Sequence, residues 1–357
     1  MLRLQFFFYS AVSVLFFTSC FGDFSGSTIK PLAVSKTNDV VIIASKDLWN
    51  GMVGDTLIYY MESPFPITPN PEPLFNLRYF TFQQIDAEPL RRQLRTYLVL
   101  VDLADTSEGE YKMLKEDLGA EKFAKMQQTG NQLLFGRDKW ARDQLVIYLI
   151  GKNKEDLVKN IGSNFNQITE KIYAHDESQL LKATYYSSEN FKLQEKVNAD
   201  FGIKIKIPSE YQQAYYLEKD KFFWMRRDSK KSIINFWVSR IQNLRGSDEK
   251  KLLLEYINKF GTIVTADTKD SHLVPNYTDM PILDFKRNIN GNEAIEYRGI
   301  WEMTKDFMGG PYVAYLVKDK NSKDYIFFFG FTYGPGEDKK EYLQQLMAIA
   351  KTIDFKK

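Results

Sequence analysis

The chain has 357 residues, 44% hydrophobic and 26% charged, and its 48 Lys and Arg residues nearly balance its 46 Asp and Glu residues, leaving a net charge of +2. This composition is typical of a water-soluble globular body long enough for two domains. The balanced charge, with no basic block that could neutralise a row of phosphates, argues against nucleic acid as a partner.

Residues 1–19 have the layout of an export signal, because Arg3 precedes an apolar run that ends just before Cys20, the only cysteine of the chain. Bacterial lipoproteins are lipidated at a cysteine in this position. The run is shorter than the roughly 20 apolar residues of a transmembrane helix. Simple secretion would leave an unpaired thiol at the start of the mature chain. We therefore predict a lipoprotein signal peptide at 1–19 and lipidation at Cys20.

Residues 20–38 are rich in Gly, Ser, Thr and Lys and predict a flexible tether between lipid and body. No acidic run follows Cys20, which favours the periplasmic side of the envelope of a Gram-negative bacterium. With the single cysteine assigned to the anchor, the body has no internal disulfide and no thiolate metal cluster.

Residues 39–183 predict an N-terminal domain in which strands alternate with helices, as in α/β units. The long helix is capped by Asn153 and has an apolar stripe that favours a core face. The predicted strands lie at residues 40–44, 75–82, 97–103 and 144–150, and the predicted helices at 49–61, 89–95, 108–118, 120–128 and after Asn153.

Residues 63–73 contain five prolines, which exclude a helix interior and a central strand. The pattern predicts a stiff, extended loop. Such a loop serves either as a rigid crossover packed on its own domain or as a proline-type docking segment for an aromatic groove.

The polar residues 184–200 predict a linker, and residues 201–357 a C-terminal domain of mostly antiparallel sheet covered by helices. Ile203, Ile205 and Ile207 alternate with lysines, which is typical of a half-exposed strand. Further strands are predicted at 222–226, 232–240, 293–301, 312–317 and 325–332, a helix at 248–260 capped by Gly261, and a last helix with Tyr342, Leu346, Ala350 and Ile353 on one side. The fold class is therefore α+β in two domains.

Two stretches, RGIWEMTKDFMGGPYVAY from Arg298 and FTYGPGEDKKEYLQQLMAI from Phe331, resemble a family of bacterial envelope lipoproteins known as domain of unknown function 4837. Earlier stretches resemble it too, so that the likeness covers nearly the whole mature chain. They are PNPEPLFNL from Pro69, RDKWARDQLVIYL from Arg137 and FGIKIKIP from Phe201. The resemblance implies an envelope lipoprotein and carries no catalytic residue, cofactor or ligand.

Most catalytic chemistries lack their residues in this chain. His175 and His272 are the only histidines, and neither a GxSxG elbow nor an HExxH helix is present. We therefore predict no cofactor and no metal site.

Carboxylate chemistry stays open, because hydrolysis of a glycan needs only two acids and water. Glu296, Glu302 and Asp306 are the catalytic candidates. The binding candidates lie beside them, where a glycine turn could form a charged cleft with an aromatic wall. They are Arg298, Trp301, Gly309 and Gly310. The alternative is structural: Arg298 pairs with a carboxylate, Trp301 is core, and the glycines supply positive φ.

We expect a non-enzymatic binding or assembly module, held on the membrane by an N-terminal lipid and facing the periplasm. Its expected partners are an envelope protein or polymer. The alternative is a carboxylate-dependent hydrolase acting on envelope polymer, which would place two of the candidate acids roughly 5 to 10 Å apart in a cleft.

Overall fold

The computed structural model describes residues 30–130, 132–242 and 248–355, so the predicted signal peptide and Cys20 lie outside the described residues. The chain folds into two structural units. The N-terminal unit contains residues 30–35, 41–53 and 79–160, and the C-terminal unit contains residues 36–40, 54–78 and everything from 161 onward. In the described part of the chain, no helix is long and apolar enough to cross a bilayer.

The N-terminal sheet has five strands in the order β2-β1-β3-β5-β4. Its strands are β1 (Asp39–Ile43), β2 (Asn76–Phe80), β3 (Thr96–Asp102), β4 (Gln132–Arg137) and β5 (Leu145–Gly151). β1, β3 and β5 are parallel, and β4 adds an antiparallel edge that the sequence did not predict. The central strands β3 and β5 are buried almost throughout, as parallel strands between helices must be.

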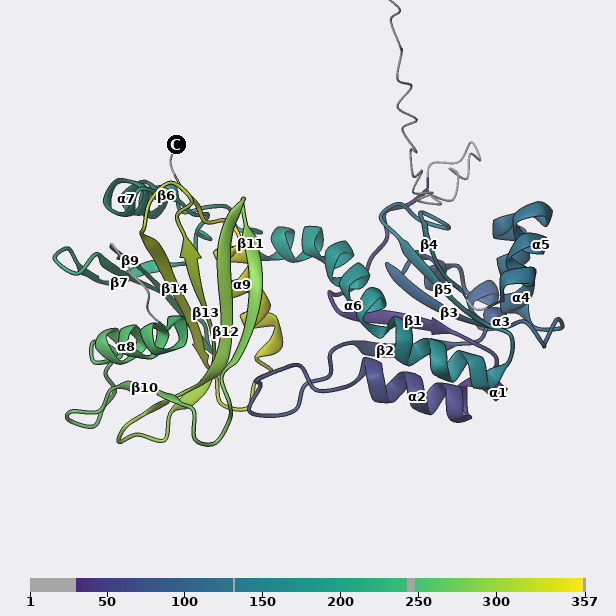
Figure 1. Ribbon diagram of the computed structural model, residues 1–357, viewed down its shortest axis with the longest axis horizontal. Coiled ribbons are helices and arrows are strands. Elements are labelled where there is room, and N and C mark those ends of the chain that lie inside the picture. The colour runs from purple at the N-terminus through teal and green to yellow at the C-terminus, as the bar shows by residue number, and fades with distance from the viewer. Residues whose placement is uncertain (1–29, 131, 243–247, 356–357) are drawn as a thin grey trace, which may run out of the picture. The chain divides into compact units, whose positions relative to one another are not determined.

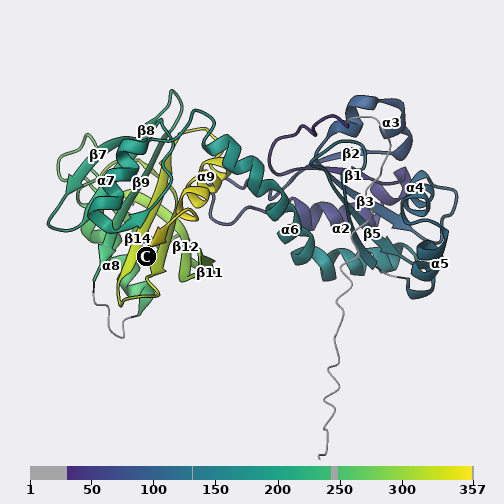
Figure 2. The ribbon, with the colours of Figure 1, turned by 90° about the horizontal axis from the view of Figure 1, so that it is seen from above.

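Helices follow the strands in the alternating order that the sequence predicted. They are α1 (Lys46–Trp49), α2 (Met52–Met61), α3 (Phe82–Ala87), α4 (Gly109–Leu118), α5 (Ala120–Thr129) and α6 (Lys154–Thr184), with a 3-10 turn at Pro89–Gln93. Ile85 of α3, Met113 of α4 and Phe123 of α5 share one core with β3 and β5, and α4 lies beside β3 in Figure 2. The helix predicted at 49–61 is two helices that separate at Asn50 and Gly51.

The C-terminal unit is built on an antiparallel sheet in the order β10-β12-β13-β14-β9-β8-β7, with β11 also paired to β12. Its strands are β7 (Gln212–Leu217), β8 (Phe222–Asp228), β9 (Ile233–Ile241), β10 (Leu273–Asn276), β11 (Leu283–Ile289), β12 (Asn292–Met303), β13 (Gly309–Lys318) and β14 (Tyr325–Tyr333). β7, β10 and β11 were not predicted. The antiparallel architecture itself is confirmed.

Each face of this sheet has its own core, because successive side chains of a strand point to opposite faces. Ile326 and Phe328 of β14 face one core with α7 (Phe191–Phe201) and α9 (Lys340–Ala350). Phe327 and Phe329 face the other core with α8 (Glu249–Gly261). Figure 1 shows α8 and α9 on opposite sides of β12, β13 and β14.

Two details of the C-terminal prediction need correction. Residues 184–200 are not a linker, since α7 begins at Phe191 and buries Leu193, Val197 and Phe201 at spacings of four. The isoleucine alternation forms only β6 (Ile203–Lys204), paired with β15 (Asp354–Phe355). Ile203, Ile205 and Ile207 are buried and Lys204 and Lys206 are exposed, so the predicted half-exposed alternation is confirmed although the strand itself is shorter than predicted.

Gly261 is the last residue of α8 and does not cap it, because the C-cap is Thr262. A Cβ at Gly261 would lie 2.2 Å from the carbonyl oxygen of Leu273. The glycine is therefore needed for the close approach of β10 to the helix.

The proline-rich loop is compact, not extended as predicted. Pro64 and Pro73 form an isolated antiparallel bridge, and the amide of Phe65 donates to the carbonyl of Glu72 at 2.6 Å. Phe65 belongs to the α7/α9 core of the C-terminal unit.

Glu72 caps a helix from a great distance along the chain. Its two carboxylate oxygens accept from the amides of Lys339 and Lys340 at 2.7 and 2.9 Å. Lys339, the N-cap of α9, makes no side-chain cap bond of its own. Glu72 thus satisfies the first amides of α9, where a negative charge is favourable.

Candidate functional site

Glu296 of β12 is a buried carboxylate with three side-chain partners. Arg298 binds Oε1 at 2.6 Å, Arg287 of β11 binds Oε2 at 2.8 Å, and the hydroxyl of Tyr315 on β13 donates to Oε2 at 3.0 Å. The strand register explains the cluster. Tyr315 lies directly opposite Glu296 on β13. On β11 the residue opposite Glu296 is Phe285, and Arg287 lies two positions further along, on the same face of the sheet.

The cluster holds Glu296 ionised. Burial alone would raise the pKa of Glu296, but the charge of Arg298 and the hydrogen bonds from Arg287 and Arg298 bring it below its ordinary value. Arg298 is in turn sandwiched between rings, with its guanidinium carbon 5.2 Å from the centroid of Phe65 and 5.0 Å from that of Phe285. A carboxylate held in this way cannot supply a proton at neutral pH, as a general acid must.

The other two candidate acids lie elsewhere, Glu302 exposed and Asp306 half-buried. Glu302 is six residues from Glu296 on the same strand, about 20 Å away at the usual rise of a strand. It accepts a bond from the amide of Asn276 at 3.0 Å. Asp306 accepts from the hydroxyl of Thr268 at 2.6 Å, and hydrogen bonds from Ser271 and Thr268 lower its pKa. Glu296 and Glu302 therefore do not form a glycosidase-type pair.

Trp301 is 2% exposed and lies in the core beneath α8. Its indole nitrogen donates to the carbonyl of Thr332 at 3.2 Å. Its ring packs edge-on against Phe331, with centroids 5.3 Å apart. Trp301 is therefore placed in the core and not on the wall of a cleft.

Gly309 and Gly310 are the first residues of β13, and neither has a positive φ angle, so the expectation of positive φ is wrong. A Cβ at Gly310 would lie 2.2 Å from the carbonyl oxygen of Thr332, and one at Gly309 would lie 2.8 Å from that of Trp301. These glycines let neighbouring strands approach closely at the end of the β12–β13 hairpin.

The C-terminal unit has two adjoining hollows on the side of α7 and β15. The larger one, of about 680 Å³, is lined by residues of α7, β6, β15 and the segments beside them. The smaller one, of about 270 Å³, reaches Glu296, Arg287 and Tyr315. Both are lined by Asn290 and Lys351, so the two hollows meet at these residues. We call them together the polar groove.

The lining of the polar groove mixes hydrogen-bond donors and acceptors of both signs. In the larger hollow the lining residues are Glu189, Gln194, Glu195, Asn198, Lys204, Ile205, Lys206, Asn290, Lys351, Thr352 and Asp354. Several are held in place: Lys206 pairs with Glu189 at 3.0 Å, and Asn290 donates to the carbonyls of Lys351 and Ile353. Hydrogen bonds from Gln194 and Lys206 lower the pKa of Glu189 although burial opposes them.

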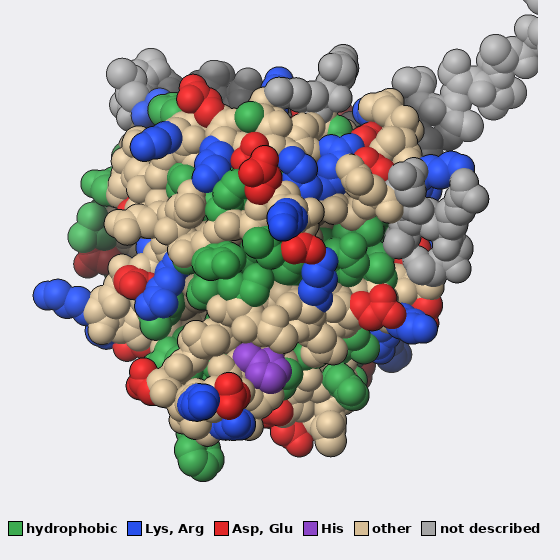
Figure 3. Space-filling view, turned by 90° about the vertical axis from the view of Figure 1, so that its left-hand side faces the viewer, with side chains coloured by type: hydrophobic (Ala, Val, Ile, Leu, Met, Phe, Trp, Pro, Cys, Tyr) green, Lys and Arg blue, Asp and Glu red, His purple; other side chains and the backbone are tan. Residues whose placement is uncertain are grey.

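Charges of both signs are also interspersed on the face of the protein drawn in Figure 3. Blue and red side chains alternate there with apolar patches. This surface suits partners of low net charge better than polyanions.

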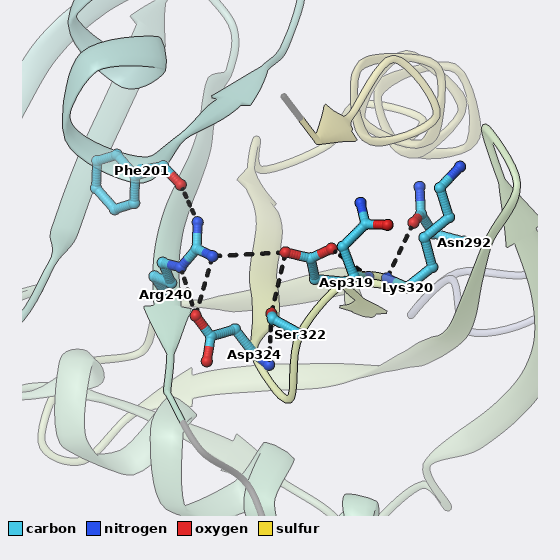
Figure 4. Close-up of polar contacts among 8 residues, drawn as sticks. Phe201, Arg240, Asn292, Asp319, Lys320, Ser322 and Asp324 are labelled. Carbon is cyan, nitrogen blue, oxygen red and sulfur yellow. Dashed lines mark hydrogen bonds and ion pairs between the residues drawn. The ribbon is translucent and has the colours of Figure 1, made fainter. Parts of the chain in front are cut away.

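A charged cluster fixes α7, which lines the groove, to the sheet of the C-terminal unit (Figure 4). Arg240 of β9 binds Asp324 through Nε at 3.0 Å and approaches Asp319 at 3.6 Å. Its third nitrogen donates to the carbonyl of Phe201, the last residue of α7, at 2.5 Å. Arg240 thus joins the C-terminus of α7 to the β13–β14 turn. Its positive charge lies at the C-terminal end of the helix dipole, where a cation is favourable.

None of the groove residues of α7 or β15 was predicted from the sequence. Their common signal is weak, because Gln, Asn, Glu and Lys on a helix are the ordinary composition of a solvated face. Only the buried stripe of α7 could have shown that residues 184–200 belong to a folded unit. Within the described residues, no three His, Cys, Asp or Glu side chains are arranged to hold a metal ion.

Two family models match the chain. A domain of unknown function, DUF8532, matches residues 33–185, and a domain of unknown function, DUF4837, matches residues 190–352. The sequence motifs suggested a resemblance to DUF4837 over nearly the whole mature chain. The family model matches only the C-terminal part, and residues 33–185 match DUF8532 instead. No match is found among the curated proteins.

Solved structures resemble the chain only remotely. The Ran-binding protein Mog1p of Saccharomyces cerevisiae is 7% identical, with a TM-score of 0.28 over 43% of this chain and 90% of that one. A protein of Bacteroides thetaiotaomicron is 12% identical, with a TM-score of 0.20 over 44% and 46%. The lipid transfer and protein localization domain of human StarD13 is 8% identical, with a TM-score of 0.19 over 45% and 95%. Scores this low carry no argument about fold or function.

Proposed function

Because the family model that matches residues 190–352 is described only as a domain of unknown function, we propose the function of this chain from its own residues. We propose that the protein is a non-enzymatic binding module of the cell envelope, tethered to the membrane by a lipid on Cys20 and facing the periplasm. The C-terminal unit binds a hydroxyl-rich envelope polymer of low net charge in the polar groove.

The observation that carries the binding proposal is the composition of the groove. Two hollows of about 680 and 270 Å³ adjoin, and most of their lining residues are amides, carboxylates or ammonium groups. Such side chains donate to and accept from hydroxyl and amide groups of a polar strand. Cations and anions are nearly balanced in the lining, so a polyanion gains little there while a neutral polar strand finds both kinds of partner.

The geometry offers the hydrolase alternative no comparable support. Of the three candidate acids, only Glu296 lines the groove, and it is bound by two arginines and a tyrosine. A glycosidase needs a second carboxyl group roughly 5 to 10 Å away and one acid with a raised pKa. The pKa of Glu296 is lowered instead.

Binding to the groove is tested with the purified body of the protein and insoluble cell-wall glycan, by co-sedimentation. Asn198 and Lys204 line the groove and make no side-chain bond that the fold depends on, so Asn198→Ala with Lys204→Ala is the test variant. We expect the affinity to fall about tenfold, the usual effect of losing hydrogen bonds to a ligand. The matched control is Lys219→Ala with Lys230→Ala, two exposed positions of the same unit outside the groove.

Equal binding by wild type and test variant would place the ligand elsewhere. No binding by the wild type would refute the polymer proposal, and release of soluble glycan fragments by the wild type would favour the hydrolase.

The tether is tested by Cys20→Ala in cells fed a labelled fatty acid. The variant should lose the label and move from the membrane fraction to the soluble fraction. Label that persists in the variant would refute both the anchor and the localisation built on it.

A further inference from the structure

The N-terminal unit has a small pocket at the carboxyl ends of its parallel strands. Residues of the pocket follow β1 (Ser45 and Asp47), end β3 (Asp102) and follow β5 (Lys154). β2 lies on one side of β1 and β3 on the other, so the strand order reverses at this point. In open α/β sheets, ligands bind at the carboxyl ends of the strands where the order reverses.

The charge of the pocket is unusual for that position. Its lining contains five carboxylates and one lysine, namely Asp47, Asp102, Asp105, Glu108, Glu110 and Lys154. Sites of this kind in other α/β sheets often bind phosphate at a helix N-terminus. Here Glu108 and Glu110 occupy the start of α4, so the chain supplies its own anions and an anionic ligand is repelled.

Glu110 is the second and independent indication of a ligand. The residue is only 2% exposed, and it lines the pocket. Oε1 accepts from the amide of Phe82 at 3.3 Å. Oε2 has no hydrogen-bond partner among the described residues. A buried carboxylate oxygen without a donor is costly, and a cation in the pocket would remove that cost.

The lysine of the pocket does not fill this role. Lys154 pairs with Asp47, and both side chains are largely exposed, so this ion pair lies at the rim of the pocket. Burial raises the pKa of Glu110, and Glu108 and Asp105 raise it further, while hydrogen bonds only partly oppose them. Burial also raises the pKa of Asp102 despite the nearby charge of Lys154. The floor of the pocket therefore lacks positive charge.

The free volume of the pocket limits the size of a cation that can enter it. This volume is about 10 Å³, enough for one water-sized group. A metal ion would need several carboxylates converging on one point, and no such set exists in the described part of the chain. An ammonium group needs only acceptors at hydrogen-bond distance, and it has three donors to share among them.

We propose that the N-terminal unit binds a primary ammonium group in this acidic pocket, with the unpartnered oxygen of Glu110 as its principal acceptor. The carrier of the ammonium group remains outside the pocket, because there is room for the head group alone. A small free amine and a lysine side chain of a peptide share this chemistry.

The experiment titrates the full-length Cys20→Ala protein with butylammonium chloride and follows the side-chain carboxyl signals of Glu110 and Asp102 by NMR. Binding should be saturable, with a Kd on the order of 1 mM, and butanol should not bind. Glu110→Gln should weaken the binding at least tenfold, because the charged acceptor is lost. Glu121→Gln, an exposed acid of α5, is the matched control and should bind like wild type.

A second pair of probes distinguishes the two carriers. If Gly-Lys-Gly binds more tightly than butylammonium and its Nε-acetylated form does not bind, the carrier is a peptide. If butylammonium binds at least as well, the carrier is a free amine.

Three results would overturn the proposal: equal binding by Glu110→Gln and wild type, equal binding of butanol and butylammonium, or binding of calcium chloride without binding of butylammonium. Circular dichroism checks that Glu110→Gln is folded. If Glu110→Gln does not fold, Asp102→Asn serves as the test variant. It removes a second acceptor of the pocket, and we expect it to weaken butylammonium binding tenfold as well.

Discussion

Glu110 in the N-terminal unit and Glu296 in the C-terminal unit are each 2% exposed. Burial raises the pKa of Glu110, whereas Arg298 and Arg287 outweigh burial and lower the pKa of Glu296. The two side chains have the same chemistry and the same burial, so the difference comes from their neighbours. Glu296 has cations on β11 and β12, and Glu110 has carboxylates at the start of α4 and the end of β3.

The comparison shows which buried acid points to a ligand. Glu296 is satisfied by its own chain, and its cluster holds β11, β12 and β13 together. Glu110 leaves Oε2 without a hydrogen-bond partner among the described residues, and its pocket is the one in which we propose a cation from outside. Burial and residue type alone would not have distinguished the two glutamates.

The largest effect should come from breaking the satisfied cluster. Arg298→Ala removes one cation from the buried Glu296 and the stacking partner of Phe65 and Phe285. We expect the free energy of unfolding to fall by about 3 to 5 kcal/mol, measured by urea denaturation. The control is Arg226→Ala, which breaks the exposed pair with Asp228 and should cost less than about 1 kcal/mol. Similar losses in both variants would show that Glu296 does not depend on Arg298.

An opposite and smaller effect is expected in the other unit. Glu110→Gln removes a buried charge that has no cation beside it and one oxygen unpartnered among the described residues, so the variant should be more stable than wild type at pH 7, by on the order of 1 kcal/mol. The folded-state pKa of Glu110 is raised, so its contribution to stability is fully present below the unfolded value of 4.5 and is lost as the pH rises through the folded value. The gain should therefore vanish near pH 4. A variant less stable than wild type at pH 7 would mean that Oε2 has a partner.

The smallest effect should come from the other two candidate acids. Glu302→Ala removes an exposed side chain and Asp306→Ala a half-buried one, each with hydrogen bonds to neighbouring polar groups. Each should change the free energy of unfolding by less than about 0.5 kcal/mol and leave binding of cell-wall glycan unchanged. A large loss of binding in either variant would move the ligand site from the polar groove to the end of the β12–β13 hairpin.

The sequence predicted the fold where one periodicity dominates. β3, β5, β9, β13 and β14 are runs of apolar and β-branched residues, and their positions were predicted within a few residues. β7 and β11 were missed because they lie at sheet edges and expose most of their side chains, so that no apolar alternation marks them. α7 was missed because only three of its residues are buried, and the polar remainder is typical of a linker.

The sequence could name candidate acids but could not say which cations lie beside them. Arg298 was predicted to pair with a carboxylate, and it does so through local spacing, two positions from Glu296. Arg287 reaches Glu296 only because β11 pairs with β12, and no local sequence pattern predicted that pairing. The pocket around Glu110 requires residues from after β1, the end of β3 and after β5, which only the strand order brings together.

The cap that Glu72 provides for α9 has a consequence for synthesis of the protein. Glu72 is synthesised about 270 residues before the amides that it binds. The segment around Glu72 therefore cannot form these hydrogen bonds until nearly the whole chain has been translated. Contacts that span so much of a chain slow folding and leave apolar residues such as Phe65 exposed in the meantime. A fragment that begins at residue 190 would start between Glu72 and the α9 amides that Glu72 caps. It would contain the whole antiparallel sheet and still lack part of its own core.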